Sequence, residues 1–135
     1  MSDNQFIWPI RVYYEDTDVG GIVYHSNYLK YFERARSEWL RKLGYELDEL
    51  AEDGLMFVVT HAELDFIVPA KFNEALEVHS TVTEFRGASF TFAQRLMRGE
   101  LCLVRASVKA ATVNSTTLRP TKMPRNLKQE MGFVS

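Results

Sequence analysis

The densest group of reactive side chains in the sequence lies between Tyr13 and Tyr28, where the chain reads YYEDTDVGGIVYHSNY. A carboxylate such as that of Asp16 or Asp18 can attack a carbonyl carbon directly, or it can deprotonate a water molecule that attacks instead. His25 supplies an imidazole, which exchanges protons near neutral pH. The segment therefore has the groups needed for attack on a carbonyl.

A predicted helix follows this segment. From Asn27 to Leu43, apolar and aromatic residues recur at intervals of three or four, and Gly44 is well placed to end the helix. The stripe consists of Tyr28, Phe32, Ala35, Trp39 and Leu43, widened by Leu29 and Leu40. Backbone N–H groups at a helix N-terminus lack intrahelical partners and can stabilise an oxyanion. We expect N–H groups near Tyr24 and His25 to do so.

Each of these residues also has a purely structural interpretation. Aspartates are common in turns and at helix caps, so Asp16 and Asp18 could serve the backbone alone. A histidine beside a helix start is often only a hydrogen-bonding partner. The adjacent Gly20 and Gly21 permit positive φ or close approach of another group to the backbone. Residue types and spacing leave both interpretations open.

The remaining segments predict strands and turns. The first strand should run from Phe6 to Tyr14, with Pro9 indicating a sheet edge or a bend. A short helix is expected before Gly54. Four further strands are expected over Leu55–Val68, Leu76–Phe85, Ser89–Met97 and Leu101–Val113. Residues 86–88 and 98–100 are short enough to be hairpin turns, so the last three strands should form an antiparallel meander. The tail after Asn114 should be irregular. This order predicts one α+β domain over residues 1–135, with a long helix packed on a five-stranded antiparallel sheet.

Composition excludes several classes of function. The 16 Lys and Arg residues are dispersed and balanced by 18 Asp and Glu, so no nucleic-acid partner is expected. There is neither a signal-peptide pattern nor an apolar run long enough to span a membrane, and Cys102 is the only cysteine. We therefore expect a cytoplasmic protein. No nucleophile elbow, phosphate-binding loop or zinc-ligand spacing occurs, and no metal is expected.

Self-association is expected from the apolar pattern of the strands. Phe57 and Val59 alternate with Met56 and Val58, so both faces of that strand are apolar. One helix covers only one face of a sheet. Pairing with a second copy would bury the rest, and symmetric homo-oligomers are the commonest outcome.

One segment resembles a known family signature. The order Tyr13–Asp18, Gly20-Gly21, Val23–His25, Asn27-Tyr28 and Phe32–Arg36 is similar to that of the Tol-Pal-associated acyl-CoA thioesterases. These belong to the 4-hydroxybenzoyl-CoA thioesterase group of hotdog proteins. Pro69-Ala70, the Arg86–Ser89 turn and the proline-containing tail extend the resemblance, while Val19 stands where Ala is usual.

The resemblance implies a hotdog fold, subunits joined into homodimers or homotetramers, and hydrolysis of an acyl-CoA thioester. Asp18 would be the catalytic carboxylate, as nucleophile or general base, with Tyr14 and His25 in the same site. Gly21 and Tyr24 would contact substrate. Arg86 and Ser89, and less directly Arg119, would contact the phosphates of coenzyme A, and Arg86 is equally well described as a solvated turn residue.

Several alternatives stay open at this stage. No cofactor is expected, because coenzyme A would be part of the substrate. The acyl donor could be acyl-CoA or acyl carrier protein, and the acyl length is undetermined. Rival functions are a non-catalytic acyl-carrier or partner-binding module of the cell-envelope system and a hotdog dehydratase. The dehydratase would need a different motif on the helix, which this sequence lacks.

Overall fold

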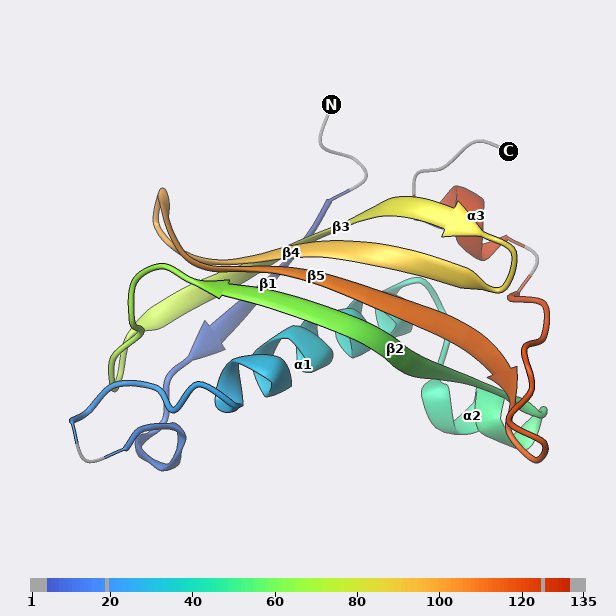
Figure 1. Ribbon diagram of the computed structural model, residues 1–135, viewed down its shortest axis with the longest axis horizontal. Helices are drawn as coiled ribbons and strands as arrows, with labels where there is room; N and C mark the ends of the chain where they lie inside the picture. The colour runs from blue at the N-terminus through green and yellow to red at the C-terminus, as the bar shows by residue number, and fades with distance from the viewer. Residues whose placement is uncertain (1–4, 19, 125, 132–135) are drawn as a thin grey trace.

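The computed structural model describes residues 5–18, 20–124 and 126–131, and its centre is a curved antiparallel sheet of five strands that wraps one long helix (Figure 1). The strands lie in the order β1-β3-β4-β5-β2. Within this described part, no helix is long and apolar enough to cross a membrane. The elements in chain order are β1 (Phe6–Arg11), the 3-10 helix η1 (Tyr14–Asp16), α1 (Asn27–Lys42), α2 (Leu47–Glu52), β2 (Leu55–Phe66), β3 (Ala75–Arg86), β4 (Ser89–Arg98), β5 (Leu101–Asn114) and α3 (Leu127–Glu130).

The antiparallel meander expected from the sequence is confirmed in β3, β4 and β5. Arg86 pairs with Ser89 across one hairpin, so its turn consists of Gly87 and Ala88 alone. Gly87 has a φ of +60°, a conformation that glycine adopts without steric cost. Pro9 lies in β1, which is an edge strand as predicted.

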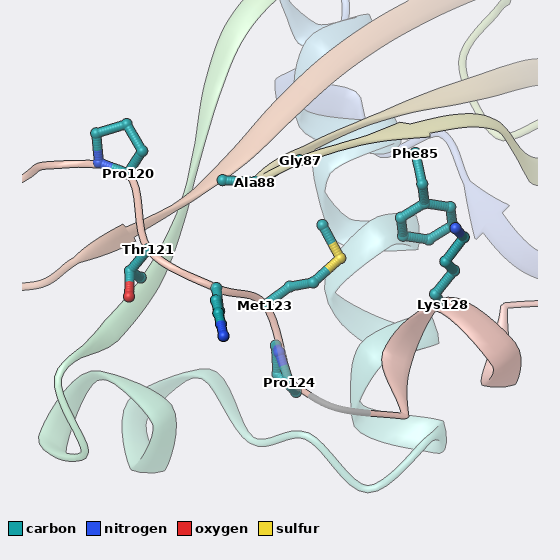
Figure 2. A pocket seen from close by; sticks show the side chains of 9 residues that line it. Phe85, Gly87, Ala88, Pro120, Thr121, Met123, Pro124 and Lys128 are labelled. Atoms are coloured by element: carbon teal, nitrogen blue, oxygen red, sulfur yellow. The ribbon is translucent and has the colours of Figure 1, made fainter. Parts of the chain in front are cut away.

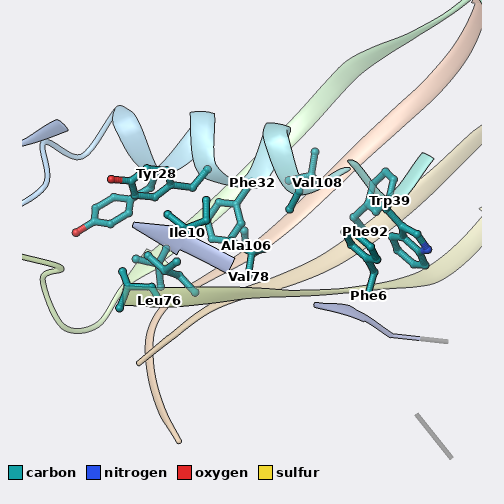
Figure 3. Packing of buried hydrophobic residues seen from close by; sticks show 14 of the residues in the cluster. Phe6, Ile10, Tyr28, Phe32, Trp39, Leu76, Val78, Phe92, Ala106 and Val108 are labelled. Carbon is teal, nitrogen blue, oxygen red and sulfur yellow. The ribbon is translucent and has the colours of Figure 1, made fainter. Parts of the chain in front are cut away.

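The hydrophobic core lies between α1 and the concave face of the sheet (Figure 3). Most of the predicted helical stripe is buried there, including Phe32 and Ala35 at 0% exposure. Two residues differ from the prediction: Leu29 is 46% exposed, whereas Tyr31 is only 1% exposed. Tyr31 falls three residues after Tyr28 and four before Ala35, so the helical period itself places it on the packed face.

The largest differences from the predicted elements concern the end of β1 and the tail. β1 ends at Arg11 rather than Tyr14, because the chain turns into η1 at Tyr14. The tail contains a short helix, α3, where irregular structure was expected. Leu127 and Met131 anchor that helix by complete burial, and four residues are too few to show a helical period.

Exposed apolar side chains gather at one edge of the sheet rather than over its outer face. The outer face carries Arg95, Arg105 and Lys109, which are exposed. Val59 and Phe66 on the edge strand β2 are 51% and 56% exposed, and Ile67 directly after it is 50% exposed. Within the described residues, β2 pairs only with β5. Exposed apolar side chains and a strand edge without a neighbouring strand therefore coincide at β2 in the described part of the chain.

A buried polar group joins α1 to the middle of the sheet. The Gln94 amide donates to the Phe32 carbonyl and the Ser80 hydroxyl, both at 3.0 Å, and it accepts from the Arg36 guanidinium at 3.0 Å. Burial lowers the pKa of Arg36, because the charged form loses solvation. The hydrogen bond to the Gln94 side-chain oxygen therefore replaces part of the solvation that the Arg36 guanidinium loses on burial.

We expect Gln94→Leu to lower the free energy of unfolding by about 1–3 kcal/mol, because it removes the acceptor from Arg36 at nearly unchanged side-chain volume. Urea denaturation measures this. Gln129→Leu on the exposed surface of α3 is the matched control and should change stability by less than about 0.5 kcal/mol. Equal effects of the two substitutions would contradict a structural role for the Gln94 network.

Candidate active site

The segment before α1 folds into a small hairpin around Asp18. Thr17 and Val23 form a β-bridge, and the Asp18 N–H donates to the Ile22 carbonyl at 3.0 Å. The Gly21 N–H donates to the Asp18 carbonyl at 3.0 Å, and Gly21 has a φ of +76°. A side chain at Gly21 would strain that conformation. The Gly21 N–H is thus already hydrogen-bonded within the turn, to the Asp18 carbonyl.

Asp16 holds this hairpin against α1. Asp16 as a whole residue is 7% exposed, and one carboxylate oxygen accepts hydrogen bonds from both the Tyr31 hydroxyl and the Tyr13 N–H at 2.9 Å. Its carbonyl accepts the Asn27 side-chain amide at 2.9 Å and the Tyr24 N–H at 3.0 Å. Asp16 therefore fastens both ends of the segment, as the structural interpretation of a loop aspartate requires.

The Asp18 side chain, unlike that of Asp16, is not buried. It is exposed, and Oδ1 accepts the Gly20 N–H at 3.0 Å. Its second oxygen, Oδ2, has no hydrogen-bonding partner among the described residues. An exposed carboxylate held from one side only can approach a reacting carbon or a water molecule.

His25 lies beside a cleft of about 290 Å³ at the start of α1. Its ring centroid is 4.5 Å from that of Tyr24 and 6.4 Å from that of Phe66. The cleft is bounded by Val23, His25, Tyr28 and residues 66–69. The Tyr28 hydroxyl accepts the Ala70 N–H at 3.1 Å, and burial raises the pKa of Tyr28. The walls are mainly apolar, which suits an acyl group.

The backbone donors near the helix start differ in part from the expectation. The Tyr24 N–H is unavailable, because it donates to the Asp16 carbonyl. The N–H groups of His25 and Ser26 have no acceptor within the part of the chain that the structure describes. Ser26 occupies the N-cap position but makes no side-chain cap bond. Two unpaired amides therefore remain at the helix N-terminus.

The predicted phosphate contacts lie away from these groups, whereas Tyr14 lies in η1, directly before the Asp18 hairpin. Tyr14 is 78% exposed, and its ring meets Phe72 edge-on at 5.7 Å. Arg86 and Ser89 flank the β3–β4 turn, at the end of the sheet opposite to the Asp18 hairpin (Figure 1). The hairpin is fixed near the start of β3 through Ile22 and Lys71. The 12 residues of β3 are joined by 11 steps of about 3.3 Å, so its two ends lie at most roughly 36 Å apart.

One chain thus brings Asp18, His25 and Tyr24 into one short segment but separates them from Arg86, Ser89 and Arg119. Arg119 precedes Pro120 near the β3–β4 turn, and its carbonyl accepts the Asn114 N–H. A substrate that contacts Asp18 of one chain therefore does not reach Arg86, Ser89 and Arg119 of the same chain without spanning the sheet. Among the described residues, no cluster of three or more His, Cys, Asp and Glu side chains suits a metal ion.

Comparison with known proteins identifies the family. The sequence profile of the thioesterase-like superfamily matches residues 12–131. The chain belongs to this superfamily. It is 47% identical over 129 residues to the acyl-CoA thioesterase YbgC of Haemophilus influenzae, covering 95% of both chains. It is 37% identical over 131 residues to the acyl-CoA thioester hydrolase YbgC of Escherichia coli, covering 96% of this chain and 98% of that one.

A solved structure supports the same assignment. The crystal structure of a probable thioesterase from Bartonella henselae matches with a TM-score of 0.84 at 39% identity, covering 89% of this chain and 99% of that chain. The expected hotdog fold, a helix wrapped by a five-stranded antiparallel sheet, is confirmed.

The sequence pattern missed one partner in this thioesterase-like site, Tyr31. Its phenol was not singled out, although the helical period puts it on the buried face of α1, toward the preceding segment. Burial first, and then the hydrogen bond from its hydroxyl to Asp16, raise the pKa of Tyr31. The phenol therefore stays protonated and keeps donating to the carboxylate.

We expect Tyr31→Phe to lower the free energy of unfolding by about 1.5–3 kcal/mol, because it removes a hydrogen bond to a buried charge. The raised pKa means that the folded protein binds this proton more tightly than the unfolded chain. The stabilisation should be complete below the ordinary tyrosine value of 10.0 and decline as the pH rises beyond it. Urea denaturation of both proteins at pH 8 and above pH 10 measures the difference, and a gap that widens with pH would contradict this account.

Proposed function

We propose that this chain hydrolyses acyl-CoA thioesters to a free acid and a thiol. Support comes from the family membership, from relatives described as acyl-CoA thioesterases, and from the chemistry of one segment. The observation that carries the proposal is the exposed Asp18 carboxylate, with one unbonded oxygen, on a hairpin fastened beside the N-terminus of α1. Coenzyme A is part of the substrate, and no separate cofactor is proposed.

In the proposed reaction, Asp18 attacks the thioester carbonyl or deprotonates an attacking water molecule. The carbonyl oxygen becomes an oxyanion, which the N–H groups of His25 and Ser26 stabilise together with the helix dipole. Collapse of the tetrahedral intermediate breaks the carbon–sulfur bond, and the thiolate leaves and takes up a proton. Direct attack gives an anhydride with Asp18 that water then hydrolyses, whereas the water route gives the acid at once.

The neighbouring side chains receive supporting roles in this proposal. The His25 imidazole lies beside the apolar cleft and is placed to assist proton transfer. Tyr14 and Tyr24 are exposed phenols on the same segment that can line the path of the substrate. Gly21 acts through its backbone conformation. Arg86 and Ser89 would meet the anionic end of a substrate held at Asp18 of another subunit.

We further propose that two copies pair through their β2 edges and that dimers associate into tetramers. A 12-residue edge strand with exposed apolar side chains is an unusual surface for a monomer. Antiparallel pairing of two β2 strands about a twofold axis would satisfy the open backbone groups and cover Val59.

The finer biological setting rests on the resemblance of residues 13–36. It supports a place beside the Tol-Pal cell-envelope machinery. The single cysteine fits the reducing cytoplasm, and acyl carrier protein is the alternative acyl donor. Fractionation of cells and capture of the tagged protein with Tol-Pal components test this setting. Recovery of the protein outside the cytoplasm would contradict it.

Asp18→Asn should lower the rate of acyl-CoA hydrolysis about a hundred- to ten-thousand-fold while the protein stays folded, because the change removes the charge and keeps the shape. A thiol-detecting assay over a panel of acyl-CoA chain lengths measures this and also defines the acyl preference. Asp53→Asn, an exposed aspartate after α2, is the matched control. Undiminished hydrolysis by Asp18→Asn would remove Asp18 from the mechanism.

A single turnover in oxygen-18 water separates the two roles of Asp18. Direct attack, followed by attack of water on the Asp18 acyl carbon of the anhydride, places the label in the Asp18 carboxylate, where mass spectrometry of the digested protein detects it. General-base catalysis places the label directly in the product acid.

His25→Ala should lower turnover by about a hundredfold or more with little change in thermal stability, because the side chain is exposed and its ring lies beside Tyr24 and Phe66 at the surface. Steady-state kinetics and thermal unfolding measure the two quantities. Full activity would return His25 to a structural role.

Val59→Lys should convert the oligomer to monomer and abolish most activity, because a charge on an edge strand opposes strand pairing. Light scattering at micromolar concentration measures the mass. Ile7→Lys is the matched control, since Ile7 is 46% exposed on the other edge strand, β1. A wild-type protein that is monomeric would contradict the proposed assembly.

A further inference from the structure

The second strand of the hairpin before α1, residues 21–23, pairs with residues 70–72 of the loop between β2 and β3. The Val23 N–H donates to the Ala70 carbonyl at 2.8 Å, and Phe72 donates its N–H to the first residue of the strand at 3.0 Å. A β-bridge joins the two segments between these bonds. The position of the strand therefore depends on where the loop lies.

One side chain of α1 holds this loop. The Ala70 N–H donates to the Tyr28 hydroxyl at 3.1 Å, and the two residues are 0% and 4% exposed. The Tyr28 ring meets the rings of Tyr31 and Phe66, with centroid distances of 6.2 and 5.6 Å, so the hydroxyl has a fixed place. In the described part of the chain, the Ala70 N–H has no second acceptor. Loss of the hydroxyl would therefore leave a buried donor unpaired.

Tyr28 also lines the cleft of about 290 Å³ beside His25, together with Val23 and Phe66. This cleft is separate from a larger cavity of about 700 Å³ at the opposite end of the sheet, which Figure 2 shows between the tail and the β3–β4 turn. Among the described residues, the Ala70 N–H is the only hydrogen-bonding partner of the Tyr28 side chain. Tyr28→Phe therefore removes one bond and keeps the ring that lines the cleft.

We propose that the Tyr28 hydroxyl positions Asp18, acting through Ala70 and residues 21–23. The inference rests on the proposed thioesterase function and adds a second anchor for the hairpin, independent of the bond between Asp16 and α1. The Asp18 N–H donates to a carbonyl of the anchored strand at 3.0 Å, so a shift of that strand displaces the carboxylate with it. A displacement of about 1 Å can slow a reaction about a hundredfold.

Steady-state kinetics of Tyr28→Phe test the proposal at a temperature where thermal unfolding shows the variant to be folded. We expect kcat for acyl-CoA hydrolysis to fall about tenfold or more while KM changes less than about twofold, because the cleft keeps its lining. Tyr45→Phe is the matched control: it removes a hydroxyl that donates to Glu130 at 2.5 Å beyond the other end of α1, and kcat should not change. Equal kcat values of the two variants, or a rise in KM alone, would overturn the proposal.

The Asp18→Asn background separates positioning of Asp18 from a general loss of activity. In that background, Tyr28→Phe should slow the residual hydrolysis by less than about twofold, because the group that it positions is gone. A further tenfold loss would contradict action through Asp18.

Amide hydrogen exchange followed by NMR tests the anchor without any thioester. In Tyr28→Phe, the N–H groups of Val23 and Phe72 should exchange about tenfold faster or more, because the loop is released. The Tyr13 N–H, which bonds to Asp16 at 2.9 Å, is the internal control and should not change. Unchanged exchange of Val23 and Phe72 would overturn the inference. If the wild type hydrolyses no acyl-CoA, the proposed function fails, and the exchange rates still decide whether Tyr28 anchors the strand.

Discussion

Burial of the Asp16 carboxylate under the segment that precedes α1 is the constraint on which the candidate site depends. A buried charge is strongly destabilising unless hydrogen bonds replace its lost solvation. Here the Tyr31 hydroxyl and the Tyr13 N–H supply them, at 2.9 Å each. Because Tyr31 belongs to α1 and Tyr13 to the segment itself, satisfying the charge fixes one against the other. The hairpin that carries Asp18 is consequently held at the helix N-terminus, where unpaired N–H groups of His25 and Ser26 remain. The two aspartates, which are separated by one residue, therefore differ: Asp16 is buried and hydrogen-bonded within the protein, whereas Asp18 is exposed.

The sequence predicted the elements well where a period extends over many residues. The helical spacing of Phe32, Ala35 and Trp39 and the short turns at Gly87 and Gly99 have local causes, so local patterns reveal them. The end of β1 and the four-residue α3 depend on single tertiary contacts, such as the complete burial of Leu127, and no local pattern contains these. Residue spacing also could not predict which of Asp16 and Asp18 has a structural role. The assignment of catalysis to Asp18 came from the family resemblance, and the structure adds that Asp16 is buried and bonded to Tyr31 whereas Asp18 is exposed.

Separation of the phosphate-binding candidates from Asp18 has a consequence for assembly. A sequence orders residues along the chain but does not say that β3 carries Arg86 up to roughly 36 Å from the loop. The apolar β2 edge offers the surface through which another copy can bring these groups together. In this thioesterase, folding and association would therefore be prerequisites of the same site. The cleft beside His25 would receive the acyl group, while Arg86 at the far end of a neighbouring subunit would meet the anionic end of the substrate.

The central claim is that the Asp16–Tyr31 bond acts on catalysis only by holding Asp18 in place. A double-mutant cycle of single-turnover hydrolysis rates, combining Tyr31→Phe with Asp18→Asn, measures this coupling directly. The account predicts that Tyr31→Phe slows the reaction when Asp18 is present and has almost no effect once Asp18 is replaced. Two losses that multiply independently in the double variant would contradict it.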